Sequence, residues 1–120
     1  HIGGEARSKS TDLILGKITA VNSENLPVIL MGDFNLEPKA TGIMRISEVM
    51  NDSRHSSKYQ FGPEGTINGF KFSEPVTRRI DSIFTSKANI EVLKYAVLTD
   101  SKDQKYPSDH FPVFVELQLK

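Results

Sequence analysis

The most restrictive pattern in this chain is an alternation of apolar and polar residues at its C-terminal end. Apolar residues recur at every second position from Phe111 to Leu119, whereas the positions between them include Phe114, Glu116 and Gln118. Successive side chains of a β-strand point to opposite faces of a sheet, so this period predicts a strand with one face on a core. The fold must therefore contain a sheet with a layer covering one side.

Three earlier segments also favour strands. The runs Arg79–Thr85 and Ile90–Leu98 are rich in β-branched and aromatic residues. The short run Val28–Met31 is apolar without alternation, which is typical of a strand buried on both faces. We therefore expect a sheet of several strands.

Helical periodicity marks two segments. Residues 6–24 contain no proline, and small or apolar residues recur there at steps of three and four, which predicts an amphipathic helix ending near Asn25, before Pro27. Pro38 is well placed as the first residue of a second, shorter helix that runs to about Met50.

Residues 53–78 are rich in Ser, Gly and charged residues, and contain the turn signals Gly62-Pro63 and Asn68-Gly69. We expect a long surface loop or an irregular hairpin there, and loops of this length are often functional. The order helix, strand, helix, then several strands predicts an α+β fold with a mostly antiparallel sheet and flanking helices. The 120 residues are within the range of one domain.

Composition excludes several classes of protein. The 15 basic and 15 acidic side chains cancel, so no bulk field attracts nucleic acid or an anionic membrane. No apolar run is long enough for a membrane span, and nothing at the start resembles a signal peptide, so the sequence leaves the cellular compartment open. The absence of Cys rules out disulfides and thiolate metal sites, leaving oxygen and nitrogen ligands.

Four polar residues flank two of the predicted strands. Asp33 and Asn35 follow the strand at 28–31, and Asp109 and His110 precede the C-terminal strand. If these strands are antiparallel neighbours, the four side chains meet at one edge of the sheet. Turn chemistry is the competing interpretation, because Asp and Asn are common turn residues and a surface histidine needs no partner.

Asp81 stands alone in an apolar, strand-like run. It could be the carboxylate that fixes the tautomer of His110 and raises its basicity, or it could form a salt bridge with Arg78 or Arg79. Ser108 does not complete a Ser-His-Asp triad, because consecutive residues of an extended segment point to alternating faces. The remaining carboxylate, amide and imidazole groups suit a hard divalent cation such as Mg²⁺ and a phosphate ester.

Three motifs together resemble the C-terminal motifs of the endonuclease/exonuclease/phosphatase superfamily, which has the DNase I-like fold. They are Met-Gly-Asp-Phe-Asn at 31–35, Arg-Ile-Asp-Ser-Ile-Phe at 79–84 and Pro-Ser-Asp-His-Phe-Pro-Val at 107–113. The segment Gly65–Phe70 is similar to a loop of compact bacterial members, and His1–Arg7 resembles the stretch directly after the family's Thr-His-x-Asp segment. The motifs occur in the family's order across nearly the whole chain.

The resemblance implies a hydrolase of phosphate esters with Mg²⁺ or Mn²⁺ as cofactor. By motif, Asp33 would orient or deprotonate the attacking water, and Asn35 would donate to the phosphorane oxygens. His110 would contact the scissile phosphate, held by Asp81, and Asp109 would bind the metal.

The resemblance also assigns candidate substrate-binding residues and a place in a larger domain. We expect Asn68, Arg7 and His1 to bind the substrate. Family members are about twice as long, and their N-terminal half supplies further metal ligands. Residues 1–120 are therefore expected to be the C-terminal part of one domain, half of a four-layer α/β sandwich, inactive alone and self-associating through an exposed sheet face.

Two other classes of protein compete with an enzyme: a binding or scaffold module that has kept the fold without hydrolysis, and an unrelated α+β interaction domain. Five intact candidate residues favour the enzyme, because a scaffold has no chemical need to keep Asp33, Asn35, Asp81, Asp109 and His110. The balanced charge favours a small phosphate ester, sugar phosphate or phospholipid headgroup over nucleic acid as substrate, but does not exclude DNA.

Overall fold

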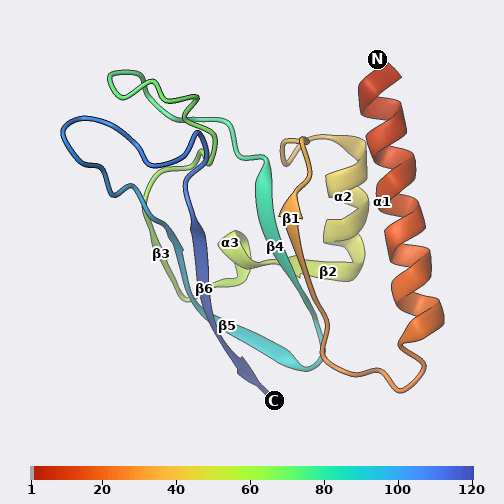
Figure 1. Cartoon of the computed structure of the whole chain (residues 1–120). Helices are drawn as coiled ribbons and strands as arrows, with labels where there is room; N and C mark the ends of the chain where they lie inside the picture. The colour runs from red at the N-terminus through yellow and green to blue at the C-terminus, as the bar shows by residue number, and fades with distance from the viewer. Residues whose placement is uncertain (1) are drawn as a thin grey trace.

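The computed structural model describes residues 2–120 as an α+β fold with two sheets (Figure 1). Every predicted helix and strand region contains the expected type of element, and three short elements in 50–61 were not predicted. In chain order the elements are α1 Ile2–Val21, β1 Ile29–Asp33, α2 Thr41–Val49, β2 Met50–Asp52, α3 Ser53–Ser56, β3 Tyr59–Phe61, β4 Asp81–Ser86, β5 Ile90–Val97 and β6 Val113–Leu119.

The strands form two three-stranded sheets rather than one. The first has the order β1-β4-β2 and is antiparallel throughout. The second has the order β3-β5-β6, with β5 and β6 antiparallel and β3 parallel to β5. The expected antiparallel character is therefore confirmed except at β3, and the chain passes from one sheet to the other after β2, after β3 and after β4 (Figure 1).

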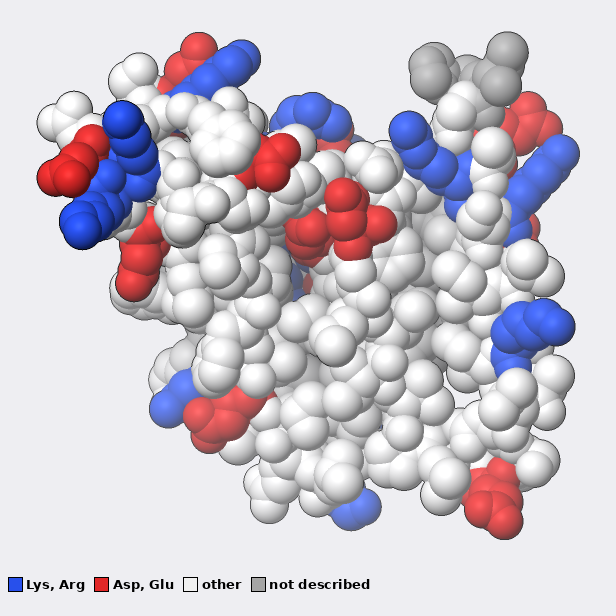
Figure 2. Space-filling model, in the orientation of Figure 1, with Lys and Arg blue, Asp and Glu red and all other residues white. Residues whose placement is uncertain are grey.

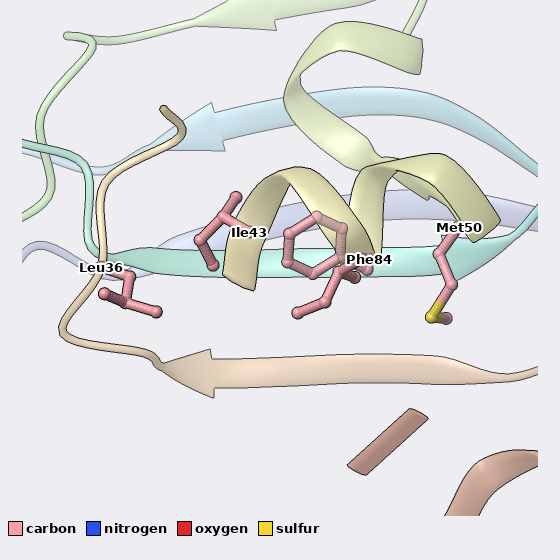
Figure 3. Close-up of a cluster of buried hydrophobic side chains, with 5 residues drawn as sticks. Leu36, Ile43, Met50 and Phe84 are labelled. Carbon is pink, nitrogen blue, oxygen red and sulfur yellow. The ribbon is translucent and has the colours of Figure 1, made fainter. Parts of the chain in front are cut away.

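Helix α2 covers one face of the first sheet, and α1 lies outside it (Figure 1). Ile43 and Ile46, one helical turn apart on α2, are buried against Phe84 of β4, as Figure 3 shows for Ile43 and Phe84. Phe34 meets Phe84 edge to face, with ring centroids 5.7 Å apart. This cluster packs on one face of β4 and holds the strand in place. The position of Asp81, the first residue of β4, is therefore fixed by the packing of the strand.

A second core lies beneath β5 and β6. Tyr95, Val97 and Phe111 are buried there, and Tyr106 from the preceding loop packs edge to face on Phe111 with ring centroids 4.9 Å apart. This packing fixes the chain immediately after His110.

Strand β1 is not buried on both faces, so that prediction was wrong. Ile29 and Met31 are 48% and 68% exposed, whereas Leu30 packs on the α2 cluster. The other face of β1 has no covering layer within residues 2–120. Figure 2 shows a broad area without charged side chains over β1, β4 and β6, below a group of acidic side chains.

Two helix boundaries differ from the prediction. Helix α1 ends at Val21 because the Asn22 side chain donates to the Leu26 carbonyl and accepts from the Leu26 N–H, which replaces the next helical turn. Helix α2 begins at Thr41 instead of Pro38, because residues 37–40 form a turn in which the Ala40 N–H donates to the Glu37 carbonyl.

A buried ion pair joins β2 to the segment just before β4. Arg79 and Asp52 are 1% and 8% exposed, and the guanidinium donates to both carboxylate oxygens at 3.1 and 2.7 Å. Asp52 also caps α3 by accepting from the Arg54 N–H. Within the described residues, no helix has the length and apolarity to cross a membrane.

Candidate active site

Asp33 and Asp81 face each other across the first sheet. Asp33 is the last residue of β1, Asp81 is the first of β4, and the two are directly opposite in the antiparallel register. Opposite residues of an antiparallel pair project from the same face. This register places two carboxylates side by side at one end of the sheet.

His110 reaches these carboxylates from the segment that precedes β6. The strand at 28–31 and the C-terminal strand are not antiparallel neighbours, since β1 and β6 belong to different sheets, so the side chains do not meet through such a pairing. An isolated antiparallel bridge between Ile67 and His110 leads the chain to the site instead. The side chains of Asp33, Asp81 and His110 do lie together. They are brought together by the packing of the Ile67–His110 bridge against the first sheet and not by the pairing of neighbouring strands.

The imidazole of His110 lies between the two carboxylates. Its Nδ1 donates to Asp81 Oδ2 at 2.8 Å, and its Nε2 is 3.9 Å from Asp33 Oδ2. The predicted Asp81–His110 hydrogen bond is therefore confirmed. Asp33, Asp81 and His110 form a group whose ligand atoms all lie within 4.8 Å of one another, an arrangement that could hold a metal ion.

The alternative partners of Asp81 are engaged elsewhere. Arg79 pairs with Asp52, and Arg78 lies 3.6 Å from Glu37. The salt-bridge interpretation of Asp81 was therefore wrong.

The environment of His110 raises its pKa. The hydrogen bond to Asp81 is the largest cause, and the negative charges of Asp81, Asp33 and Asp109 add to it, whereas partial burial lowers the pKa. The raised pKa favours the imidazolium form. In that form Nε2–H can donate a hydrogen bond to a ligand that lies beside Asp33.

In the metal-free protein, Asp81→Asn is expected to lower the pKa of His110, because the amide removes a negative charge and leaves only a neutral, weaker acceptor for the imidazolium N–H. Titration of the imidazole protons by NMR measures it. Glu116→Gln, which removes an exposed carboxylate paired with Lys94, is the control and should leave that pKa in place. An unchanged pKa in Asp81→Asn would contradict the assigned hydrogen bond.

Asn35 belongs to a turn built by Asp33. Its backbone is left-handed, with φ of 52°, and its N–H donates to Asp33 Oδ1 at 2.8 Å. Asp33 is therefore both a turn residue and a residue of the candidate site. Its Oδ1 accepts the hydrogen bond that closes the turn, and its Oδ2 faces His110. Asn35 itself is exposed beside the carboxylates.

Asp109 lies beside this group but outside it. Its backbone carbonyl accepts from the N–H groups of Asn68 and Gly69 at 2.7 and 3.1 Å, and the residue is exposed. Its metal-binding role stays a prediction. Figure 2 shows acidic side chains gathered at the upper ends of β1 and β4, with basic side chains towards the margins, an environment that suits a cation.

The three predicted substrate-binding residues lie in different places. Asn68 is 6% exposed, and its side-chain amide donates to the Ser108 carbonyl and accepts from the Phe70 N–H, so it holds the loop together. Arg7 is exposed on α1, which packs against α2. His1 lies outside the described residues. The substrate-binding roles of all three stay predictions.

Sequence reasoning missed one buried residue beside the site. Thr66 is 0% exposed and accepts hydrogen bonds from the N–H groups of Ile80 and Asp81. A threonine in the loop motif 65–70 was the available signal, but the residue type alone does not show that its hydroxyl reaches β4.

Comparison with known proteins gives consistent matches. The model of the Endonuclease/Exonuclease/phosphatase family matches residues 6–110. The mannosyl-6-phosphatase Bt3783 from Bacteroides thetaiotaomicron VPI-5482 is similar over 98% of this chain and 48% of its own, at 38% identity and a TM-score of 0.88. A functionally unknown conserved protein from Enterococcus faecalis V583 is 30% identical over 98% of this chain and 46% of its own, with a TM-score of 0.87.

A more distant likeness concerns the fold alone. The human Nocturnin catalytic domain with bound sulfate is 20% identical over 98% of this chain and 42% of its own, with a TM-score of 0.73. No curated protein matches the chain. The chain spans about half the length of the solved structures that it matches.

Proposed function

The chain belongs to the endonuclease/exonuclease/phosphatase family, whose members hydrolyse phosphate esters, and from this premise we propose that it is the catalytic C-terminal part of a divalent-metal-dependent phosphoesterase. The observation that carries the proposal is the imidazole of His110, held by Asp81 at 2.8 Å with its Nε2 directed at Asp33. The chain has the DNase I-like fold of the similar structures and covers 48% of the length of Bt3783.

In this proposal water attacks phosphorus and forms a new P–O bond, while the ester P–O bond breaks and the released alcohol takes up a proton from the solvent. Asp33 orients the water or takes its proton through Oδ2, because Oδ1 is committed to the Asn35 N–H. The imidazolium of His110 donates from Nε2 to the phosphate and stabilises the negative charge that develops in the transition state. The Asn35 side chain donates to the same oxygens, and Asp81 acts through His110 by holding its tautomer and charge.

The residues present fit a hard cation. Asp109 offers carboxylate oxygens at an exposed, acidic end of the sheet, and Mg²⁺ or Mn²⁺ commonly takes only one or two protein carboxylates. When bound, such an ion polarises the phosphoryl oxygen and the attacking water. Asp81 is less available as a ligand, because its Oδ2 already accepts the Nδ1–H of His110.

We further propose that residues 1–120 form the C-terminal part of a single domain, preceded by the half that supplies the remaining ligands. Support comes from the order of the three motifs and from matches that cover 98% of this chain but less than half of the similar structures. We call this chain together with that half the complete enzyme.

A small phosphate ester, with a hexose phosphate as the first candidate, is the proposed substrate class. The similar Bt3783 is described as a mannosyl-6-phosphatase. The formal net charge of this chain is zero, and carboxylates gather at the candidate site, which disfavours a long polyanion. A panel of mannose 6-phosphate, a glycerophosphodiester and a DNA oligonucleotide distinguishes the three classes.

Removing divalent metal from the complete enzyme is expected to reduce hydrolysis of the preferred member of this panel by at least about tenfold, because a bound cation supplies several kcal/mol of charge stabilisation. Activity is measured after chelation and again after titration with Mg²⁺ or Mn²⁺. Full turnover of the chelated enzyme would contradict the metal dependence. Absence of turnover on every ester with either metal would favour the scaffold interpretation.

A further inference from the structure

We propose that Thr66 is a positioning residue that sets the distance between Asp81 and His110. The inference rests on the proposed function, because it assigns Thr66 to the same reaction. Thr66 lies in the irregular segment between β3 and β4 and is fully buried. It is not among the candidate catalytic residues identified by motif.

The side chain of Thr66 holds the start of β4. Its Oγ1 accepts from the backbone N–H of Ile80 and from that of Asp81, each at 3.1 Å. Its own N–H donates to the Arg78 carbonyl at 2.8 Å. Thr66 therefore fixes the backbone of Asp81 from one side, while the register with β1 fixes it from the other.

The backbone around Thr66 holds the segment that carries His110. The Thr66 carbonyl accepts from the Phe111 N–H at 2.7 Å, and the next residue, Ile67, forms the bridge with His110. Asn68 and Gly69 then donate to the Asp109 carbonyl. One residue thus contacts both chain segments whose side chains form the Asp81–His110 hydrogen bond.

Such a connection is needed because Asp81 belongs to β4 of the first sheet, whereas His110 lies in the segment before β6 and outside both sheets. Hydrogen bonding within a sheet sets the register between its own strands, but it does not set the spacing between β4 and the segment before β6. The hydrogen bond of 2.8 Å weakens steeply when the angle at its hydrogen falls below about 120°, and it is lost when its atoms move apart to about 3.6 Å. A misplacement of about 1 Å in an active site can reduce the rate about 10²-fold.

The test compares three substitutions in the complete enzyme. Thr66→Val keeps the shape but removes the acceptor, Thr66→Ser keeps the hydroxyl, and Thr66→Cys offers a weaker acceptor of similar size. We expect kcat for the preferred ester to fall about 10²-fold in Thr66→Val with KM little changed, to fall less in Thr66→Cys, and to stay near wild type in Thr66→Ser.

A second readout is independent of catalysis. The Nδ1–H proton of His110, hydrogen-bonded to Asp81, should give a downfield NMR resonance that His110→Ala assigns by its loss. We expect this resonance to weaken or shift in Thr66→Val and to persist in Thr66→Ser. Thermal unfolding of each variant checks that the fold is kept, and Thr66→Cys supplies the comparison if Thr66→Val does not fold.

The outcomes separate the two proposals. Folded Thr66→Val with wild-type kcat and an unchanged resonance would overturn the positioning role. Equal losses in Thr66→Val and Thr66→Ser would also overturn it, because the hydroxyl would then not be the relevant group. If the wild type hydrolyses no phosphate ester but the resonance still depends on the hydroxyl, the proposed function fails while the positioning of His110 by Thr66 stands.

Discussion

His110→Ala in the complete enzyme is expected to lower kcat by about 10²–10⁴-fold, the usual contribution of a positioned acid or base. The substitution removes the imidazolium. Among the described residues of the proposed site, this is the positively charged group that faces the phosphate. Asp33→Asn should have a similarly large effect, because the amide cannot accept the proton of the attacking water. Both side chains are partly exposed, so neither substitution opens a cavity in either core.

The measurement is steady-state kinetics at saturating metal, with circular dichroism to confirm the fold. His55→Ala is the matched control, because His55 is 70% exposed on α3 and lies outside the candidate site. Asp81→Asn should reduce kcat less than His110→Ala, since it keeps a hydrogen-bonding side chain. Undiminished kcat in His110→Ala would exclude the proposed mechanism.

Residues 1–120 alone are expected to have no measurable turnover, to bind Mg²⁺ weakly and to self-associate. Met31 of β1, which is 68% exposed, and Val113 of β6 line one groove beside Asp33 and Asp81, so the exposed apolar surface of β1 continues to the start of β6. Exposed apolar faces of this kind are normally covered by another protein surface. A two-fold dimer that packs sheet on sheet is the simplest arrangement.

Sedimentation and a metal-dependent phosphoesterase assay test both parts of this expectation. Met31→Lys places a charge on the uncovered face and should shift the chain towards the monomer, whereas Lys17→Gln on the exposed part of α1 should not. A stable monomer of wild-type sequence with substantial turnover would show that residues 1–120 suffice, and the half-domain proposal would fail.

The sequence predicted the elements better than their arrangement. Alternation identified β6 because side-chain period depends only on neighbouring residues. The same alternation cannot show which strand lies next to β6, and in the structure that strand is β5 rather than β1. Strand β3 was missed because its three residues are all exposed and its partner, β5, is distant in sequence and parallel to it.

The candidate site was predicted by its motifs and confirmed in its central contact, the hydrogen bond from His110 to Asp81. The motifs could not predict how the site is assembled. The Asp33–Asp81 pairing depends on register, and the contacts of Thr66 with Ile80 and Asp81 depend on a loop without regular periodicity. Asp52 was not predicted as the partner of Arg79, because it lies outside the three motifs and in a segment that was expected to be the end of a helix and the start of a loop.

The buried pair of Arg79 and Asp52 restricts how this family member can diverge. Losing either partner alone leaves an uncompensated charge in the interior, at a cost of about 3–5 kcal/mol. That cost is a large share of the roughly 5–15 kcal/mol that stabilises a typical domain. Replacing both partners together with apolar residues of matching volume avoids the penalty. We therefore expect this pair to change only through a destabilised intermediate or by two near-simultaneous substitutions, so that packing alone restricts the sequence next to β4.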